Sequence, residues 1–296
     1  MPSSPMPRPI SLAGSEPVNA GMKRYAVFGH PIKHSRSPEI HGRFAEQTRI
    51  SLEYRAIDVA PENFAAQLSS FREMGGHGLN CTIPLKEIAF EAASSHSEAA
   101  RLCGAVNTLY WLEDGRLHGD NTDGCGLVRD LSLNLGIEIK GLNILILGAG
   151  GATRGIIGPL INAQAQSLWI ANRSEERAQN LARQFRQLTD IRTSGLGALK
   201  GQSFDLILNA TAASLSGSVP DIPAGILAQG GSCYDLAYAK DPTPFVRWGH
   251  DQGARQSADG IGMLVEQAAE AFFLWHGIRP DTGPVIRALS EGARVA

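Results

Sequence analysis

An apolar run that ends in a glycine-rich loop constrains the fold of this chain more than any other feature. Residues 142–147, LNILIL, are almost continuously apolar, as expected of a strand that is buried on both faces of a sheet. The run breaks directly into GAGGATRG (148–155), and a helical stretch follows. Glycines in such a turn let the backbone approach a pyrophosphate, and the start of the helix offers free N–H groups. The feature therefore predicts a βα unit that binds a dinucleotide.

The loop departs from the strict GxGxxG pattern, because Thr153 stands at the last glycine position. Gly148, Gly150 and Gly151 occupy the turn itself. Glycines alone are equally consistent with an ordinary tight turn, and this alternative stays open. The apolar strand before the loop and the helix after it favour the dinucleotide interpretation.

A second motif indicates which dinucleotide binds. In such domains the end of the second strand carries an acidic residue for NAD, because a carboxylate accepts a hydrogen bond from the ribose 2'-hydroxyl. This chain instead reads NRSEER at 172–177. The guanidiniums of Arg173 and Arg177 and the hydroxyl of Ser174 suit a 2'-phosphate, which a carboxylate would repel. We therefore predict NADP; the alternative is that Ser174 caps a helix and Arg177 is a solvated residue of its first turn.

Short β-rich runs alternate with helical patterns from residue 24 onward, which is typical of βαβ units and a mainly parallel sheet. The fold class is therefore α/β. Strands are expected at 24–29, 52–59, 77–83, 142–147, 167–171, 203–210 and 231–237, and helices at 38–48, 61–74 and 261–277. A hairpin is expected within 106–120, with its turn at 113–116.

Composition and charge exclude several classes of protein. The 27 Lys and Arg residues against 29 Asp and Glu give a net charge of -2, without the basic surplus of proteins that coat nucleic acid or anionic lipid. No run reaches the roughly 18 apolar residues that a membrane helix needs. The four cysteines form neither a CxxC pair nor a zinc-type spacing with histidine. We therefore expect no metal site, no disulfide framework and a cytoplasmic protein.

Two residues of the first half fit acid–base chemistry. Lys86 follows Pro84 at the end of a predicted strand, near a sheet edge where ligands of α/β proteins bind. Asp123 lies in the glycine-flanked loop GDNTDG (119–124). Taken singly, each has a plainer interpretation, as a solvated lysine and as an Asx-turn residue that caps the next helix. Together they fit ketone reduction, because hydride delivery leaves an alkoxide that an ammonium held by a carboxylate can protonate.

Nine short runs stand in the order and spacing typical of the shikimate dehydrogenase family, which this sequence resembles over about residues 24–290. The runs are GHPIKHSRSPEIH (29–41), NCTIPLKE (80–87), GAVNTL (104–109), GDNTDG (119–124), GAGGATRG (148–155), NRSEER (172–177), NATAASL (209–215), YDLAYAKDPTPF (234–245) and DGIGMLVEQAA (259–269). Each run alone is weak, but nine in series are specific. His30 stands where the family often has asparagine, a change that we expect to affect packing more than catalysis.

The resemblance implies a role for each matching residue. Lys86 and Asp123 would be the catalytic pair, with Lys86 as proton donor or acceptor and Asp123 as its orienting partner. The substrate-binding residues would be Ser35 and Ser37 on the carboxylate, Asn80, Asn107 and Gln267 on the ring hydroxyls, and Thr82, Asp123 and Tyr238 in the same pocket. The cofactor-binding residues would be Gly148, Ala149, Gly150, Gly151, Ala152 and Thr153 on the pyrophosphate, Asn172, Arg173, Ser174 and Arg177 on the 2'-phosphate, and Gly260 and Met263 beside the nicotinamide.

The resemblance also implies a division into two α/β domains. The expected parts are a substrate-binding and catalytic domain at 22–124, a Rossmann-like NADP-binding domain at 125–258, and C-terminal helices at 259–296. The proline-rich run at 1–21 has no counterpart in the family, and its composition predicts a disordered tail. The apolar helix within the last part is expected to return to the first domain.

The implied activity is the reversible, NADP-dependent reduction of 3-dehydroshikimate to shikimate in aromatic amino-acid synthesis. A quinate/shikimate dehydrogenase of broader specificity is the close alternative, since quinate carries one extra hydroxyl beside the carboxylate. A non-catalytic ligand sensor and a dehydrogenase for another polar ring also stay open, although the Lys86–Asp123 pair and the substrate-binding set argue against them. The expected partner is a small molecule, not nucleic acid or a membrane, and we expect a monomer or a homodimer, with the homodimer favoured.

Overall fold

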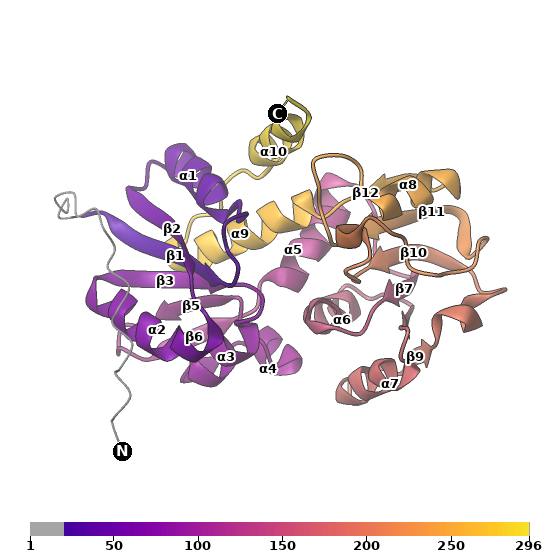
Figure 1. Cartoon of the computed structure of the whole chain (residues 1–296), viewed down its shortest axis with the longest axis horizontal. Helices are drawn as coiled ribbons and strands as arrows, with labels where there is room; N and C mark the ends of the chain where they lie inside the picture. Colours follow the sequence, from indigo (N-terminus) through magenta and orange to yellow (C-terminus); the bar gives the residue numbers. More distant parts are fainter. Residues whose placement is uncertain (1–20, 296) are drawn as a thin grey trace, which may run out of the picture.

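Two six-stranded sheets lie side by side in the computed structural model, which describes residues 21–295 (Figure 1). Helices alternate with strands along both halves of the chain, so the predicted α/β class is confirmed. The predicted disordered tail lies, except for Gly21, outside the described residues. Among the described helices, none combines the length and the apolar character needed to cross a bilayer.

The first sheet is mixed and has the strand order β2-β1-β3-β5-β6-β4. Its strands are β1 (Lys23–Gly29), β2 (Leu52–Asp58), β3 (Gly76–Cys81), β4 (Ser95–His96), β5 (Thr108–Trp111) and β6 (Leu117–Asp120). Its helices are α1 (Ser37–Thr48), α2 (Phe64–Glu73), α3 (Lys86–Ala92) and α4 (Glu98–Cys103). The predicted hairpin is present as β5 and β6, which pair antiparallel, while β1 lies parallel between β2 and β3.

The second sheet is parallel throughout and has the order β12-β11-β10-β7-β8-β9. Its strands are β7 (Asn143–Leu147), β8 (Ser167–Ala171), β9 (Ile191–Ser194), β10 (Phe204–Asn209), β11 (Leu227–Asp235) and β12 (Gln256–Ala258). Its helices are α6 (Gly151–Asn162), α7 (Glu175–Gln184) and α8 (Pro244–Asp251). The strand order reverses between β7 and β10, and the carboxyl ends of strands at such a switch point form the ligand crevice of doubly wound folds.

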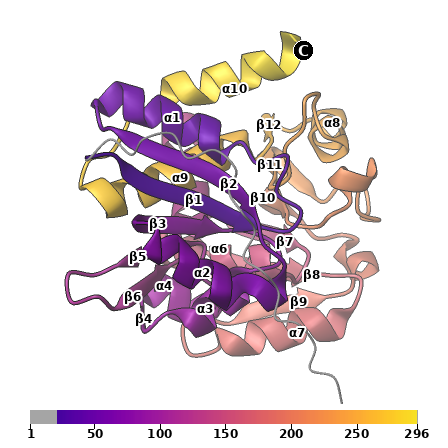
Figure 2. The same cartoon turned by 60° about the vertical axis from the view of Figure 1, so that its left-hand side comes forward.

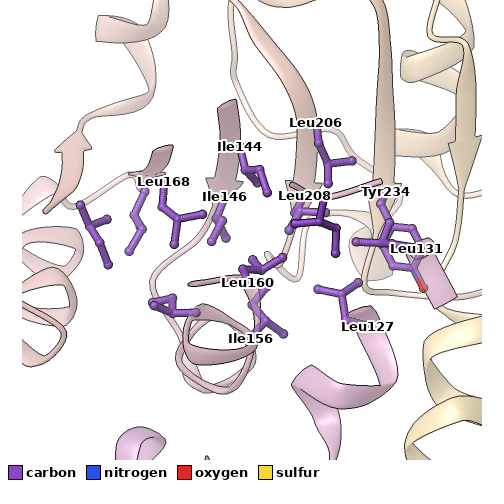
Figure 3. Packing of buried hydrophobic residues seen from close by; sticks show 14 of the residues in the cluster. Leu127, Leu131, Ile144, Ile146, Ile156, Leu160, Leu168, Leu206, Leu208 and Tyr234 are labelled. Atoms are coloured by element: carbon purple, nitrogen blue, oxygen red, sulfur yellow. The ribbon is translucent and has the colours of Figure 1, made fainter. Parts of the chain in front are cut away.

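The core of the second sheet explains the apolar run that leads into the glycine loop. Ile144 and Ile146 of β7 are fully buried and pack with β10 and with Ile156 and Leu160 of α6 (Figure 3). Leu145 and Leu147 point to the opposite face and join a separate cluster. Both faces of β7 are therefore covered, which positions the loop after it on a rigid strand.

The last two helices return to the first sheet, as predicted from the sequence. Helix α9 (Ile261–His276) begins near β12 and runs back beside β1 and α1, where α10 (Gly283–Val295) also lies (Figures 1 and 2). Phe44 of α1, Phe272 of α9 and Leu289 of α10 share one buried cluster. The chain passes between the two sheets twice, and at its second passage, from the second sheet back to the first, the packed helix α9 links them.

Helix α5 (Asp123–Arg129) makes the first crossing and continues as one π-helical turn at Asp130–Asn134. Its glycines allow close approach on two sides. A Cβ atom added to Gly124 would lie 2.5 Å from the carbonyl oxygen of Gly155 in α6, and one added to Gly126 would lie 2.7 Å from Cβ of Gln267 in α9. Helix α5 thus packs directly against both the helix after the glycine loop and the returning helix.

Candidate active site

Lys86 and Asp123 meet where two helices begin. Lys86 is the first residue of α3, which follows β3, and Asp123 is the first residue of α5, which follows β6. Lys86 Nζ donates to Asp123 Oδ2 at 2.5 Å. The side chains are 28% and 13% exposed, so the pair is sheltered but can still be reached by a small molecule. The contact with Asp123 therefore holds the Lys86 amino group, which can carry the proton, in one defined position.

Asn107 ties this pair to the returning helix. Its Nδ2 donates to Asp123 Oδ1 at 2.8 Å and lies 3.3 Å from Gln267 Oε1. Its Oδ1 accepts the backbone N–H of Thr122 at 2.9 Å, which fixes the orientation of the amide. Residues that are far apart in the sequence therefore converge on one carboxylate, and sequence reasoning missed the supporting Thr122.

Asn80 lies beneath Asn107. Its Nδ2 donates to the carbonyl of Asn107 at 3.1 Å and to Thr108 Oγ1 at 3.0 Å, and its Oδ1 accepts the hydroxyl of Tyr54 at 2.7 Å. Both donor hydrogens are thus engaged by the protein, which makes Asn80 a support for Asn107 in this arrangement. The ring of His41 stacks on Tyr54 with centroids 4.2 Å apart, and burial lowers the pKa of His41 to about 3, so this histidine is neutral.

The two predicted carboxylate-binding serines lie at the start of α1: Ser35 in the loop before the helix and Ser37 as its first residue. The N–H of Ser37 donates to Ser35 Oγ at 3.3 Å, so the two residues are adjacent. Ser35 and Tyr238 line a hollow of about 450 Å³, whose other lining residues are partly polar and partly apolar: Lys33, His34, Arg36, Ala239, Lys240, Ile261, Leu264 and Leu289. Lys33 and Lys240 favour an anion there, while Arg36 is already paired with Glu39 at 2.8 Å. Thr82 follows β3, and its N–H donates to the carbonyl of Phe28 at 2.9 Å.

His30 pairs with Asp58 at the start of the same loop. Its Nδ1 lies 2.6 Å from Asp58 Oδ1, and the other carboxylate oxygen accepts the N–H of Ile32 at 3.2 Å. The contact with His30 lowers the pKa of Asp58. His30 and Asp58 therefore fix the start of the loop that leads from β1 to Ser35. No contact among the described residues joins His30 to Lys86.

The glycine loop has the predicted geometry at the start of α6. Gly148 has a φ of +104°, which side chains rarely adopt, and the hydroxyl of Thr153 donates to the carbonyl of Gly148 at 2.9 Å. A Cβ atom added to Gly150 or Gly151 would meet no heavy atom within 4 Å. The loop therefore leaves open space at the N-terminus of a helix, and this space fits a pyrophosphate. Thr153, at the last glycine position of the motif, braces the turn from inside.

Two alanine substitutions separate the structural role of this loop from its binding role. Gly148→Ala should lower the free energy of unfolding by about 1–3 kcal/mol, because the positive φ strains any side chain and the added Cβ would lie 3.1 Å from the carbonyl oxygen of Ala210. Gly150→Ala should change stability by less than about 1 kcal/mol, yet raise the KM for NADPH about tenfold. Urea unfolding of the cofactor-free proteins and steady-state kinetics measure the two effects. If the two variants lose the same stability and show the same KM for NADPH, the binding role of the loop is not separate from its structural role.

The segment NRSEER follows β8 at the same edge of the sheet. Arg173, Ser174 and Arg177 are exposed, and neither guanidinium forms an ion pair with any residue in the described part of the chain. Ser174 is the N-cap residue of α7, but its side chain makes no capping hydrogen bond. Asn172 Nδ2 donates to the carbonyl of Ser174 at 2.9 Å. Two free cations and a free hydroxyl fit a phosphate, so this donor set suits NADP.

Gly260 and Met263 lie at the start of α9. Gly260 is the residue that precedes the helix, and its N–H donates to the carbonyl of Ala237 at 3.1 Å, just after β11. Met263 lies one turn before Gln267 and is partly buried. The returning helix therefore presents residues predicted for the cofactor and for the substrate on consecutive turns.

Known proteins match nearly the whole chain. Three family profiles match: Shikimate dehydrogenase substrate binding domain at residues 27–109, Shikimate / quinate 5-dehydrogenase at 131–216, and Shikimate 5'-dehydrogenase C-terminal domain at 260–289. The chain is 59% identical to a shikimate dehydrogenase (NADP(+)) of Methylococcus capsulatus, over 92% of this chain and 98% of that protein. It is 49% identical to the enzyme of the same name from Alcanivorax borkumensis, over 90% of this chain and 95% of that protein.

A solved structure supports the same relationship. The structure is similar to that of shikimate 5-dehydrogenase from Thermus thermophilus in complex with NADP(H) and shikimate, with a TM-score of 0.82 and 35% identity. The match covers 92% of this chain and all of that one. Sequence and fold therefore agree along their full common length.

Proposed function

Because the chain belongs to the shikimate dehydrogenase family, we propose that its Lys86–Asp123 pair carries out the reversible, NADP-dependent reduction of 3-dehydroshikimate to shikimate. The protein is thus an NADP-dependent oxidoreductase of the shikimate pathway, which supplies chorismate and the aromatic amino acids. The observation that carries the proposal is the 2.5 Å contact between Lys86 Nζ and Asp123 Oδ2, with Asn107 and Gln267 beside it. All four residues lie at positions that match family motifs.

The pair supplies the proton of the reaction. NADPH, when bound, supplies the hydride for the carbonyl carbon. The carbonyl oxygen then takes a proton from the Lys86 ammonium, which costs less than leaving an alkoxide. Asp123 orients the ammonium through Oδ2, while its Oδ1 is held by Asn107 at 2.8 Å. In the oxidation direction, the amine of Lys86 takes the proton back from the alcohol.

The other residues bind and orient. Ser35 and Ser37 would hold the substrate carboxylate, with Lys33 and Lys240, which line the hollow beside Ser35, favouring an anion. Asn107 and Gln267 would bind the ring hydroxyls, with Thr82 and Tyr238 lining the same pocket and Asn80 supporting Asn107. The exposed Arg173 and Arg177 would hold the 2'-phosphate, and the loop at 148–153 the pyrophosphate.

The direct test supplies the purified chain with 3-dehydroshikimate and NADPH. We expect consumption of NADPH and formation of shikimate in equal amounts. Consumption of NADPH without shikimate, or no consumption, would contradict the proposal.

Replacing both serines tests the binding of the carboxylate. In the double variant Ser35→Ala/Ser37→Ala the KM for shikimate should rise about 10-fold to 100-fold, because hydrogen bonds to a charged group are lost. The matched control is Ser69→Ala/Ser70→Ala in α2, which should leave KM unchanged. An unchanged KM in the first variant would remove the serines from the substrate site.

Oxidation of quinate is a second candidate activity. It is favoured by the profile described as Shikimate / quinate 5-dehydrogenase, which matches residues 131–216.

We further propose that the protein is cytoplasmic, because all four cysteines are free thiols. The homodimer stays a prediction, which analytical ultracentrifugation of the full chain tests.

A further inference from the structure

A buried polar cluster outside the catalytic pair joins the π-helical turn after α5 to β11. Asp130 is 3% exposed and Tyr234 is fully buried. The Tyr234 hydroxyl donates to Asp130 Oδ2 at 2.6 Å, and Asn134 Nδ2 donates to Asp130 Oδ1 at 2.9 Å. Burial raises the pKa of Asp130, and these two hydrogen bonds act against the shift. A carboxyl group at this depth is tolerated only with such partners.

The cluster contacts the first turn of α9. The N–H of Met263 donates to the Tyr234 hydroxyl oxygen at 3.3 Å. As the third residue of α9, Met263 has an N–H without a partner inside the helix, so the hydroxyl satisfies it. A Cβ atom added to Gly262 would overlap Asp130 Oδ1, which shows that the carboxyl group rests on the helix backbone itself. An acidic group at a helix N-terminus is also favoured by the helix dipole.

One face of α5 connects this cluster to the catalytic carboxylate. Asp123, Gly126 and Asp130 are spaced by three and four residues, which places them along one helix face. A Cβ atom added to Gly126 would lie 2.7 Å from Cβ of Gln267 and 2.9 Å from the carbonyl oxygen of Met263. The face that begins with Asp123 therefore packs against the consecutive turns of α9 that carry Met263 and Gln267. Figure 3 shows Tyr234 beside Leu131, the residue that follows Asp130.

We propose that Tyr234 and Asp130 are positioning residues that set the place of Met263 relative to the Lys86–Asp123 pair. The relay runs from Met263 N–H to the Tyr234 hydroxyl, and from this hydroxyl to Asp130. Burial raises the pKa of Asp130, and the same N–H also acts against that shift. The proposal rests on the proposed function and on the place beside the nicotinamide that the family resemblance implies for Met263. Loss of the relay frees the first turn of α9, and a misplacement of about 1 Å at a reacting centre can cost on the order of 100-fold in rate.

The test is Tyr234→Phe in the full chain, which keeps the ring and removes the hydroxyl. In the cofactor-free protein, the amide of Met263 should exchange its hydrogen about tenfold faster, because its hydrogen-bond partner is lost. The kcat for 3-dehydroshikimate reduction should fall about tenfold. The deuterium isotope effect with NADPH labelled at the transferred hydrogen should rise, because hydride transfer becomes slower.

The matched control is Ser167→Ala, which removes one hydrogen bond, from Ser167 to Asn143 Oδ1 at 2.8 Å, between β8 and β7. This variant should lose stability without changing the isotope effect or the exchange of Met263. If Tyr234→Phe behaves like the control, the two residues are merely structural and the proposal is wrong. If the proposed function is wrong, the unaltered chain lacks the activity. Amide exchange of Met263 then still shows whether Tyr234 holds the first turn of α9, so the two failures can be told apart.

Discussion

Lys86→Met is expected to lower kcat by on the order of 100-fold to 10,000-fold, the range for loss of general acid–base catalysis. Methionine keeps much of the length and the apolar stem of lysine but carries no proton. The variant leaves Asp123 with its hydrogen bond from Asn107, at 2.8 Å, so the carboxylate stays oriented. Shikimate and NADPH should still bind, because the proposed carboxylate and phosphate contacts are untouched.

The measurement pairs stopped-flow or steady-state kinetics with equilibrium binding of shikimate. The control is Lys200→Met, at an exposed lysine between short elements of the second half. It should keep full activity. Near-normal turnover of Lys86→Met would remove Lys86 from the mechanism, whereas loss of binding together with turnover would assign it to the substrate site instead.

Arg173→Leu should lower kcat/KM for NADP about 10-fold to 100-fold, because a charge-assisted hydrogen bond to the 2'-phosphate is lost. The efficiency with NAD, which lacks that phosphate, should change little. The guanidinium of Arg173 is exposed and makes no ion pair with the described residues, so its removal has little effect on folding. The preference for NADP over NAD is therefore expected to fall sharply, while the protein stays folded.

A matched control comes from the same helix. Arg183 in α7 donates to Asn180 Oδ1 at 2.8 Å and lies away from the loop, so Arg183→Leu should leave the NADP preference intact. Equal losses with both dinucleotides in Arg173→Leu would identify Arg173 as structural and would leave the 2'-phosphate without its proposed site.

The predictable part of the fold comes from long apolar runs. The run at 142–147 appears as β7, because covering both faces of a strand demands apolar residues throughout. The short elements β4, α3 and α4 have two, seven and six residues, which is too few for a periodic pattern to show. The mixed first sheet was also not expected from alternation alone, since the β5–β6 hairpin pairs antiparallel with β3.

The predictable part of the site comes from motifs at the ends of strands. Lys86 and Asp123 were predicted as partners from their residue types and loops, and they lie in contact; their catalytic roles remain to be tested. The residues that support the site from behind could not be predicted in this way. Tyr54 reaches Asn80 across the intervening strand β1, and Tyr234 lies 104 positions from Asp130. Such pairs depend on sheet order and helix packing, for which neither residue type nor local spacing gives a signal.

The most direct test of the central claim compares four rates of nicotinamide reduction, with shikimate or quinate as substrate and NADP or NAD as acceptor. Shikimate with NADP should be the fastest combination by a wide margin, and Lys86→Met should abolish most of that rate. A preference for quinate, a preference for NAD, or a rate that does not depend on Lys86 would show that the chain is not an NADP-dependent shikimate dehydrogenase that uses Lys86.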